Sequence, residues 1–599
     1  MLKKITAALL SIMMVFAMAV PAVTAQTTDE TTSVLGEITL SDAIVSMTAE
    51  KTITATVPYN GTKADFEATE WEWTWDDKPF SEWKCWTSGS TYDGDPFITV
   101  NSFGYNEETG NIELSFSNAL LYGTTDLSNG SRPRIKHLFG NHPLKLTGTK
   151  GDDTYSTETT LRLATFDHDL SYQELNPAID AALEKSKAMD DRYLEYRAIG
   201  YSTLGKEIPM GIVAKDKEDI DYYLNTWLPM ATEDPQAAAE LVKSGVDYKI
   251  PLWLDNIHSD EQPGIDAMVT LFDQFATEDT ITYKTSTKTE KVSAGYGRDT
   301  MNVPTEDDVE EEITLNVDEL LDNFIIIFVF SINPDGRDAV RRSTETGFDP
   351  NRDITYQTQP ELIATMSEIA KWMPASMIEF HGYVNDFLIE PCTAPHDPNY
   401  EYDLLAPLLV EQAYAMGKAG IAMSDSDGIK YDCFVIPYED YDTGLDGGWD
   451  DASPMYTPVA AMHYGLLGHT VEIPDMNENS YLACLGVAGA NMKFMLDNKD
   501  RVYLNQLEYW TRAVNNVDLA EKVDEYFVDA NGDVVGRPRE DGKSFFPDYY
   551  VIPVGDSQIN NYEAYNLAEY GLRNQWKIAT LNEDTTVDGV LYPAGSFVI

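Results

Sequence analysis

The spacing of apolar and polar residues changes near residue 170 and again near residue 500, which divides the chain into three parts. In the first part, apolar and polar residues alternate in short runs separated by Gly, Asn and Asp. These runs cover residues 51–57, 95–100, 111–116 and 159–165. Alternation with a period of two predicts strands that have one buried face. Residues 26–170 are therefore expected to form an antiparallel, β-rich accessory domain, for which a sandwich is one architecture.

After residue 171, apolar runs alternate with stretches of helical spacing. Helical spacing over residues 178–189 is followed by apolar runs at 194–200, 208–213, 250–254, 324–330, 377–380 and 470–473. This order is typical of an α/β domain with a mixed, largely parallel sheet and flanking helices. We expect the domain to span residues 171–500. Its active site should lie at the carboxyl ends of the strands.

The spacing of apolar and polar residues changes again from about residue 502. An apolar run at 549–554, helical spacing at 561–574 and a further run at 576–580 predict a small α/β-like module over residues 501–599. The chain ends on an apolar run, Phe597-Val-Ile599. This run fits either a last strand that docks onto the module or a chain that is cut inside it.

The first 25 residues have the pattern of an export signal. Lys3 and Lys4 supply a positive start, residues 5–20 are apolar, and Val23 and Ala25 occupy the two positions where signal peptidase accepts small residues. A membrane anchor is the alternative, although the run is short for a spanning helix. No later stretch is long enough to span a membrane, so we expect a secreted protein without stable membrane insertion.

Charge and cysteine content narrow the partners and the chemistry. The chain of 599 residues has 42 Lys and Arg against 100 Asp and Glu, a formal net charge of −58. Such an acidic surface disfavours binding to nucleic acid and to anionic membranes. Cys85, Cys392, Cys433 and Cys484 have no CxxC spacing, which argues against a cysteine zinc site. Export permits disulfides between them, and three complete pairings are possible.

Two histidines and one carboxylate are candidate metal ligands. His258 and Glu261 stand three residues apart just after an apolar run, so both can reach one cation from a single turn. His381 ends another apolar run, 120 residues after Glu261. This ligand set leaves a fourth zinc position open for water, as in hydrolytic sites. Glu472 lies on or beside a later apolar run and adds a carboxylate there.

Further motifs follow in a defined order: an Asn-Pro-Asp-Gly turn at 333–336, two arginines at 341 and 342, and an Asp-x-Asn-Arg segment at 349–352. Each residue alone is commonly an ordinary surface or core residue. In this order, over roughly residues 171–500, they resemble the M14 family of zinc carboxypeptidases.

The resemblance implies one Zn²⁺ ion per chain and a peptide or protein substrate that loses its C-terminal residue. It implies the following roles: His258, Glu261 and His381 bind zinc, Asp349 orients a zinc histidine, Arg342 polarises the scissile carbonyl, Asn351 and Arg352 bind the terminal carboxylate, and Glu472 is the general base. The physical chemistry agrees, because zinc-bound water has a pKa of about 7 and a planar guanidinium binds a carboxylate in bidentate fashion.

Several points stay open at this stage. Tyr441 and Tyr456 compete for the family's mobile tyrosine, and we favour Tyr441 because a glycine-rich segment follows it. The specificity pocket does not align, although residues 449–451 lie in its region. A peptidoglycan stem-peptide amidase, associated with the cell wall or cell surface, is an alternative within hydrolysis. A non-catalytic surface binding protein on a peptidase scaffold is an alternative of another class.

Overall fold

The computed structural model describes residues 34–128, 132–292, 301–384, 387–390, 396–426, 429–437, 454–529, 533–540 and 542–599. The expected signal peptide, Cys392 and Tyr441 lie outside these residues. Within them, no helix combines the length and the apolar character that a membrane span requires.

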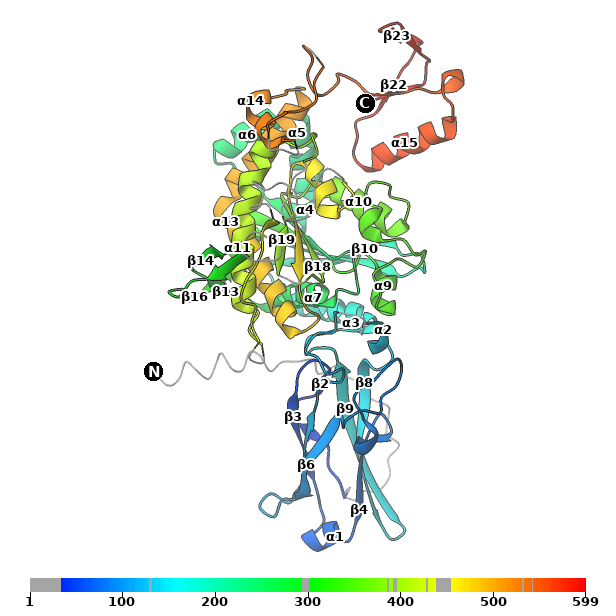
Figure 1. The fold of residues 1–599 in the computed structure, drawn as a ribbon, viewed down its shortest axis with the longest axis vertical. Helices are drawn as coiled ribbons and strands as arrows, with labels where there is room; N and C mark the ends of the chain where they lie inside the picture. The colour runs from blue at the N-terminus through cyan, green and yellow to red at the C-terminus, as the bar shows by residue number, and fades with distance from the viewer. Residues whose placement is uncertain are drawn as a thin grey trace.

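The N-terminal part is a sandwich of two β-sheets, drawn in blue and cyan in Figure 1. One sheet has the order β1 (Thr39–Leu40), β3 (Lys51–Pro58), β7 (Asn111–Asn118) and β6 (Ile98–Tyr105). The other has the order β2 (Ile44–Ser46), β9 (Asp153–Ala164), β8 (Gly140–Lys150), β4 (Glu70–Trp75) and β5 (Lys78–Pro79). Alternate residues such as Ile53, Ile112 and Leu161 are buried in one shared core. The β-rich character expected from period-two alternation is thus observed.

A seven-stranded mixed sheet organises the central part. Its order is β10 (Tyr193–Tyr201), β11 (Glu207–Ala214), β17 (Phe324–Val329), β12 (Ile250–Asp255), β18 (Ser376–Gly382), β20 (Leu467–Ile473) and β19 (Leu388–Glu390). The neighbours from β17 to β20 are parallel, whereas β10, β11 and β19 pair antiparallel at the edges. Every residue of β12, β17, β18 and β20 is buried, as expected for continuous apolar runs. The predicted α/β class with a mixed sheet is confirmed.

Helices cover both faces of this sheet. On one face, Gly264 of α7 (Gln262–Thr277) lies against Phe380, His469 bonds to Leu409 of α11 (Tyr402–Met423), and Ser376 bonds to Asn491 of α13 (Glu478–Val514). On the other face, Gly468 abuts α12 (Thr457–Ala461). Because side chains alternate along a strand, successive residues of β18 and β20 face these two different layers.

The C-terminal module is small and lies at the opposite end of the molecule from the sandwich (Figure 1). Three short strands, β21 (Val551–Ile552), β25 (Phe597–Val598) and β22 (Ala579–Thr580), form its sheet beside α15 (Asn561–Arg573). Its core is built around Ile552, Val554 and Ala564. The boundary expected at residue 500 falls inside α13, which continues to Val514. The helix stays in the central core beyond residue 500, since Val502, Tyr503 and Leu507 are buried there.

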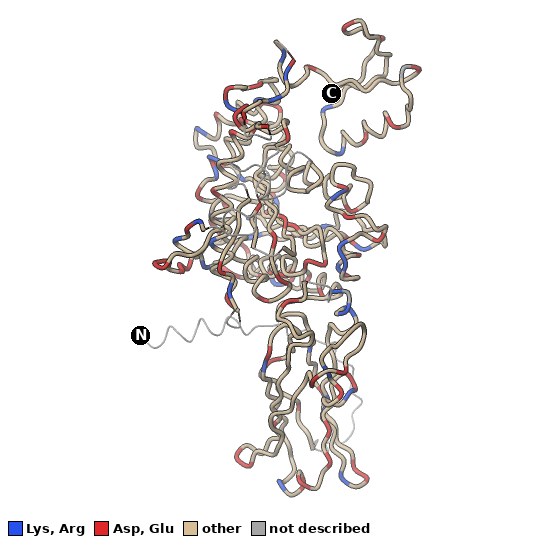
Figure 2. Tube along the Cα trace, viewed as in Figure 1, with Lys and Arg blue, Asp and Glu red and all other residues tan. Residues whose placement is uncertain are grey.

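Acidic residues occur along all three parts of the chain, as Figure 2 shows, in keeping with the net charge of −58. The cysteines Cys85 and Cys484 are free thiols. Therefore none of the three complete disulfide pairings is formed.

Candidate metal centre

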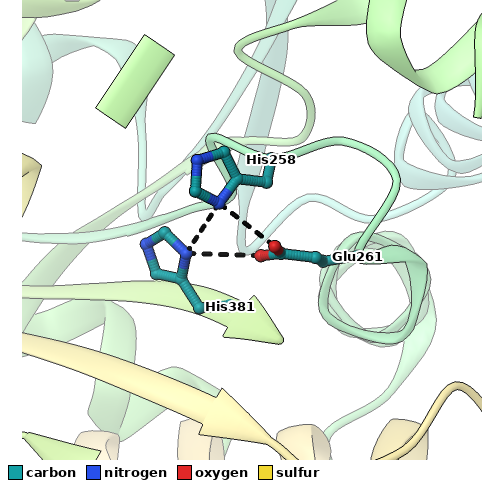
Figure 3. A group of neighbouring side chains, drawn as sticks. All are labelled: His258, Glu261 and His381. Atoms are coloured by element: carbon teal, nitrogen blue, oxygen red, sulfur yellow. Dashed lines mark hydrogen bonds and ion pairs between the residues drawn. The ribbon is translucent and has the colours of Figure 1, made fainter. Parts of the chain in front are cut away.

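The candidate ligands come together at the carboxyl ends of the neighbouring parallel strands β12 and β18. After β12 the chain makes a turn in which the Glu261 N–H donates to the His258 carbonyl at 2.8 Å, and Glu261 is the last residue before α7. His381 lies on β18, next to β12. All three side chains are buried, and Figure 3 shows them pointing toward one another.

The two Nδ1 atoms and the two oxygens of the Glu261 carboxylate lie at nearly equal distances. His258 Nδ1 lies 3.1 Å from Glu261 Oε1 and 3.2 Å from His381 Nδ1, and His381 Nδ1 lies 3.3 Å from Glu261 Oε2. A tetrahedral zinc ion with bonds of 2.0–2.1 Å requires ligand–ligand separations of about 3.3 Å. The three residues therefore fit one face of a zinc tetrahedron, and its fourth corner is left for water or substrate.

A carboxylate lies against the outer nitrogen of each histidine. His258 Nε2 is 3.0 Å from Asp349 Oδ1, and His381 Nε2 bonds to Glu379 Oε1. When each carboxylate accepts an Nε2 proton, the Nδ1 lone pair of each neutral imidazole is directed toward the centre of the triangle, where a metal would bind. Asp349 was expected in this role from the sequence. Glu379 was missed, although it stands two residues before His381 and so shares its strand face.

The charges of the cluster suit a divalent cation. Burial opposes ionisation of Glu261, but the neighbouring His258 and His381 outweigh burial and lower the pKa of Glu261 to about 2. With a metal bound, both imidazoles would be neutral, and Glu261, Asp349 and Glu379 together with the guanidinium of Arg342 would leave two negative charges. A Zn²⁺ ion would balance these charges.

Glu472 lies on the strand next to His381. The two residues are direct partners in the parallel pairing of β18 with β20, and Glu472 is buried. Its Oε2 atom has no hydrogen-bond partner among the described residues. Burial, opposed by His381 and reinforced by Glu261, raises the pKa of Glu472 to about 7. A buried carboxylate with a free oxygen and this pKa is suited to exchange protons near neutral pH.

Arg342 borders the cluster from a more exposed position. Its Nε atom donates to Asp349 Oδ2 at 2.9 Å and its Nη1 atom donates to Glu261 Oε1 at 3.4 Å, while 43% of the side chain stays exposed. The guanidinium is therefore held beside the ligands and is still accessible to a substrate oxygen.

Asn351 and Arg352 follow Asp349 in a short turn. The Asn351 Oδ1 atom accepts from the Thr457 N–H at 3.1 Å, which orients the amide. Arg352 is exposed, donates to the Asn351 carbonyl at 2.7 Å and stacks 4.8 Å from the ring centre of Tyr456. Tyr456, one of the two candidate tyrosines, therefore lies next to the proposed carboxylate-binding arginine, whereas Tyr441 is outside the described residues.

Two further buried carboxylates near the cluster were not predicted from the sequence. Burial and the charge of Glu379 raise the pKa of Asp255 well above its ordinary value, and its Oδ2 accepts from Trp253 Nε1 at 2.8 Å. Asp260 lies between the ligands of the turn and pairs with Arg132 of the sandwich at 2.8 Å. The position of Asp255 at the end of an apolar run was a usable signal, whereas no sequence pattern links Arg132 to Asp260.

The fold and the cluster define a class: α/β proteins with a buried His-Glu-His triangle at the carboxyl edge of a mixed sheet. Matching solved structures include a metallo-carboxypeptidase from Burkholderia cenocepacia, which is 12% identical, covers 62% of this chain and 83% of its own, and has a TM-score of 0.34. A metallo-carboxypeptidase from Pseudomonas aeruginosa is 12% identical, covers 78% of this chain and 97% of its own, and has a TM-score of 0.35. A carboxypeptidase A from Helicoverpa armigera is 11% identical, covers 68% of this chain and 91% of its own, and has a TM-score of 0.33.

These three proteins are carboxypeptidases, like the family that the sequence motifs resemble. No protein-family model matches the chain, and no curated protein matches it.

Proposed function

We propose that the chain is a zinc-dependent metallopeptidase that releases C-terminal residues from peptides. The observation that supports it most directly is the triangle of His258, Glu261 and His381, with Glu472 on the adjacent strand. Three protein ligands plus an unpaired carboxylate form a hydrolytic arrangement, since a purely structural zinc site is closed by four protein ligands.

The roles of the surrounding residues follow from their positions. Bound zinc would supply a Lewis acid and an activated water at neutral pH. Glu472 would accept a proton from that water and then deliver it to the leaving amine. Arg342 would hold the oxyanion that develops on the scissile carbonyl, because its guanidinium is fixed by Asp349 and partly exposed.

Release of the terminal residue is supported by Arg352. Its guanidinium is exposed and is held by the Asn351 carbonyl and the Tyr456 ring. A planar guanidinium fixed in this way can bind a terminal carboxylate through two parallel hydrogen bonds. The substrate would thus be anchored by its C-terminus, which places the bond to be cut at the last residue.

We also infer that the protein is exported and meets its substrate outside the cytoplasm, where association with a cell surface or cell wall is open to it. The support is the N-terminal pattern of Lys3, Lys4, an apolar stretch and Ala25. An acidic chain favours peptide or protein partners over nucleic acid.

A peptide-library digest read by mass spectrometry tests this function. We expect single-residue losses from C-termini that stop when a zinc chelator is added and resume when zinc is restored. Cuts inside peptides would contradict the exopeptidase part, and faster cutting of peptidoglycan stem peptides would favour the amidase. A protein that binds no zinc and cuts neither substrate would be the non-catalytic binding protein.

A further inference from the structure

The N-terminal sandwich packs directly onto the segments that carry the site. Its hydrophobic core includes Val340, Tyr383 and Met476, which belong to the central domain. Val340 is two residues before Arg342, Tyr383 is two residues after His381, and Met476 follows Glu472 by four. The sandwich therefore packs against side chains that lie two to four residues from three of the proposed functional residues.

Hydrogen bonds strengthen this contact at the end of β20. The Met476 N–H donates to Asp126 Oδ1 at 2.9 Å, and the Asn477 side chain donates to the Thr125 carbonyl at 3.1 Å. Both acceptors belong to the sandwich. The segment that follows Glu472 is thus fixed by the other domain.

Arg132 of the sandwich reaches furthest toward the metal ligands. Its Nη1 atom donates to Asp260 Oδ2 at 2.8 Å, and its guanidinium lies 5.1 Å from the ring centre of Tyr383. Asp260 precedes the ligand Glu261, and its side chain is only 4% exposed. Its Oδ1 atom has no partner among the described residues, so Arg132 is the cation that compensates this carboxylate.

A second guanidinium, that of Arg342, lies beside the same turn, because it donates to Glu261, the residue that follows Asp260. It already donates to Glu261 and Asp349, and its partly exposed side chain has room to move. A buried carboxylate that loses its partner is costly and attracts any cation within reach. Without Arg132, Asp260 would therefore compete with the substrate for Arg342.

We propose that the sandwich is an integral part of the active site and that Arg132 is a positioning residue, which neutralises Asp260 and so keeps Arg342 available to the substrate carbonyl. The inference rests on the proposed peptidase function. It assigns to the accessory domain a task in the reaction itself, in addition to its packing role.

The test compares Arg132→Ala, Arg132→Lys, Asp260→Asn and the double variant Arg132→Ala with Asp260→Asn, all in the full chain loaded with zinc. The substrate is the library peptide that the unmodified protein shortens fastest. We expect Arg132→Ala to lower kcat by about tenfold or more at unchanged zinc content, since a transition-state contact of Arg342 is lost. Arg132→Lys should keep most of the activity. The double variant should return to within about threefold of Asp260→Asn alone, because the unpaired charge is gone.

Arg134→Ala is the matched control. Arg134 lies on the same short helix, α2 (Arg132–Ile135), and its guanidinium contacts the Gly89 carbonyl and the Trp86 ring within the sandwich. Its kcat should equal that of the unmodified protein. Full activity in Arg132→Ala, or a double variant no better than Arg132→Ala, would overturn the inference. An unmodified protein without activity would instead refute the proposed function.

Discussion

The two faces of the strand pair β18–β20 carry opposite chemistry, although both are buried. One face holds Glu379, His381 and Glu472, which surround the candidate metal centre. The other face holds Phe380 and His469 and packs against helices α7 and α11. The residues of the two faces alternate along the same two strands, so burial in these strands does not by itself identify the face that holds the metal centre.

The groups around the buried histidines, His469 and His381, distinguish the two faces. Burial lowers the pKa of His469 to about 4, and its Nε2 donates to the Leu409 carbonyl at 3.0 Å. For His381, burial acts in the same direction, but Glu379 and Glu261 outweigh it and raise the pKa well above its ordinary value. A buried histidine is therefore indicated as a ligand when carboxylates lie against both of its nitrogens.

Glu472→Gln makes the strongest test of this comparison. The amide keeps the shape of the side chain but cannot accept the proton of a zinc-bound water. We expect turnover to fall by about 10²–10⁴-fold, while zinc content, measured by elemental analysis, stays at one ion per chain. His469→Leu on the other face serves as the control. Full turnover in Glu472→Gln would remove the proposed base.

Glu379→Gln tests the carboxylate behind His381. Loss of the charge that fixes the histidine proton should weaken zinc binding by about 10–100-fold, as measured by competition with a chelator. Glu411→Gln is a matched control, because Glu411 pairs with Arg501 on the surface and is 48% exposed. Unchanged zinc affinity in Glu379→Gln would mean that the carboxylate is only a packing partner.

Much of the central domain could be predicted because its parallel strands are continuous apolar runs, and the ligands follow where those runs end. Residues 250–254, 377–380 and 470–473 all fall within observed strands. Glu379 was within reach of the same reasoning, since a residue two positions from a ligand on a strand shares its face.

The contact of Arg132 with Asp260 could not be predicted. It joins residues 128 positions apart in different domains, and no periodic pattern encodes a contact of this kind. The sequence pattern changes near residue 500, yet α13 continues to Val514, and Val502, Tyr503 and Leu507 stay buried in the central core. Local periodicity therefore predicts the elements and misses the packing between domains.

His469→Leu probes the helix-packed face. It removes the donor to the Leu409 carbonyl from a fully buried position, which should destabilise the protein by about 1–3 kcal/mol. Thermal unfolding should show a melting temperature lower by a few degrees. Zinc content and turnover per folded molecule should stay unchanged. A loss of zinc in this variant would mean that the two faces are not independent.

The pH dependence of kcat/KM gives a further test of the difference between the two faces of β18 and β20. The base must be ionised, and burial raises the pKa of Glu472 to about 7. A nearby divalent cation favours the carboxylate and lowers this pKa. Activity should therefore fall as the pH drops through a value below 7, because the protonated carboxyl cannot accept a proton. His469, whose pKa burial lowers to about 4, stays neutral over this range, so His469→Leu should leave the profile in place. A profile that is flat from about pH 5 to 8, or one that shifts in His469→Leu, would contradict the assignment of Glu472 as the base.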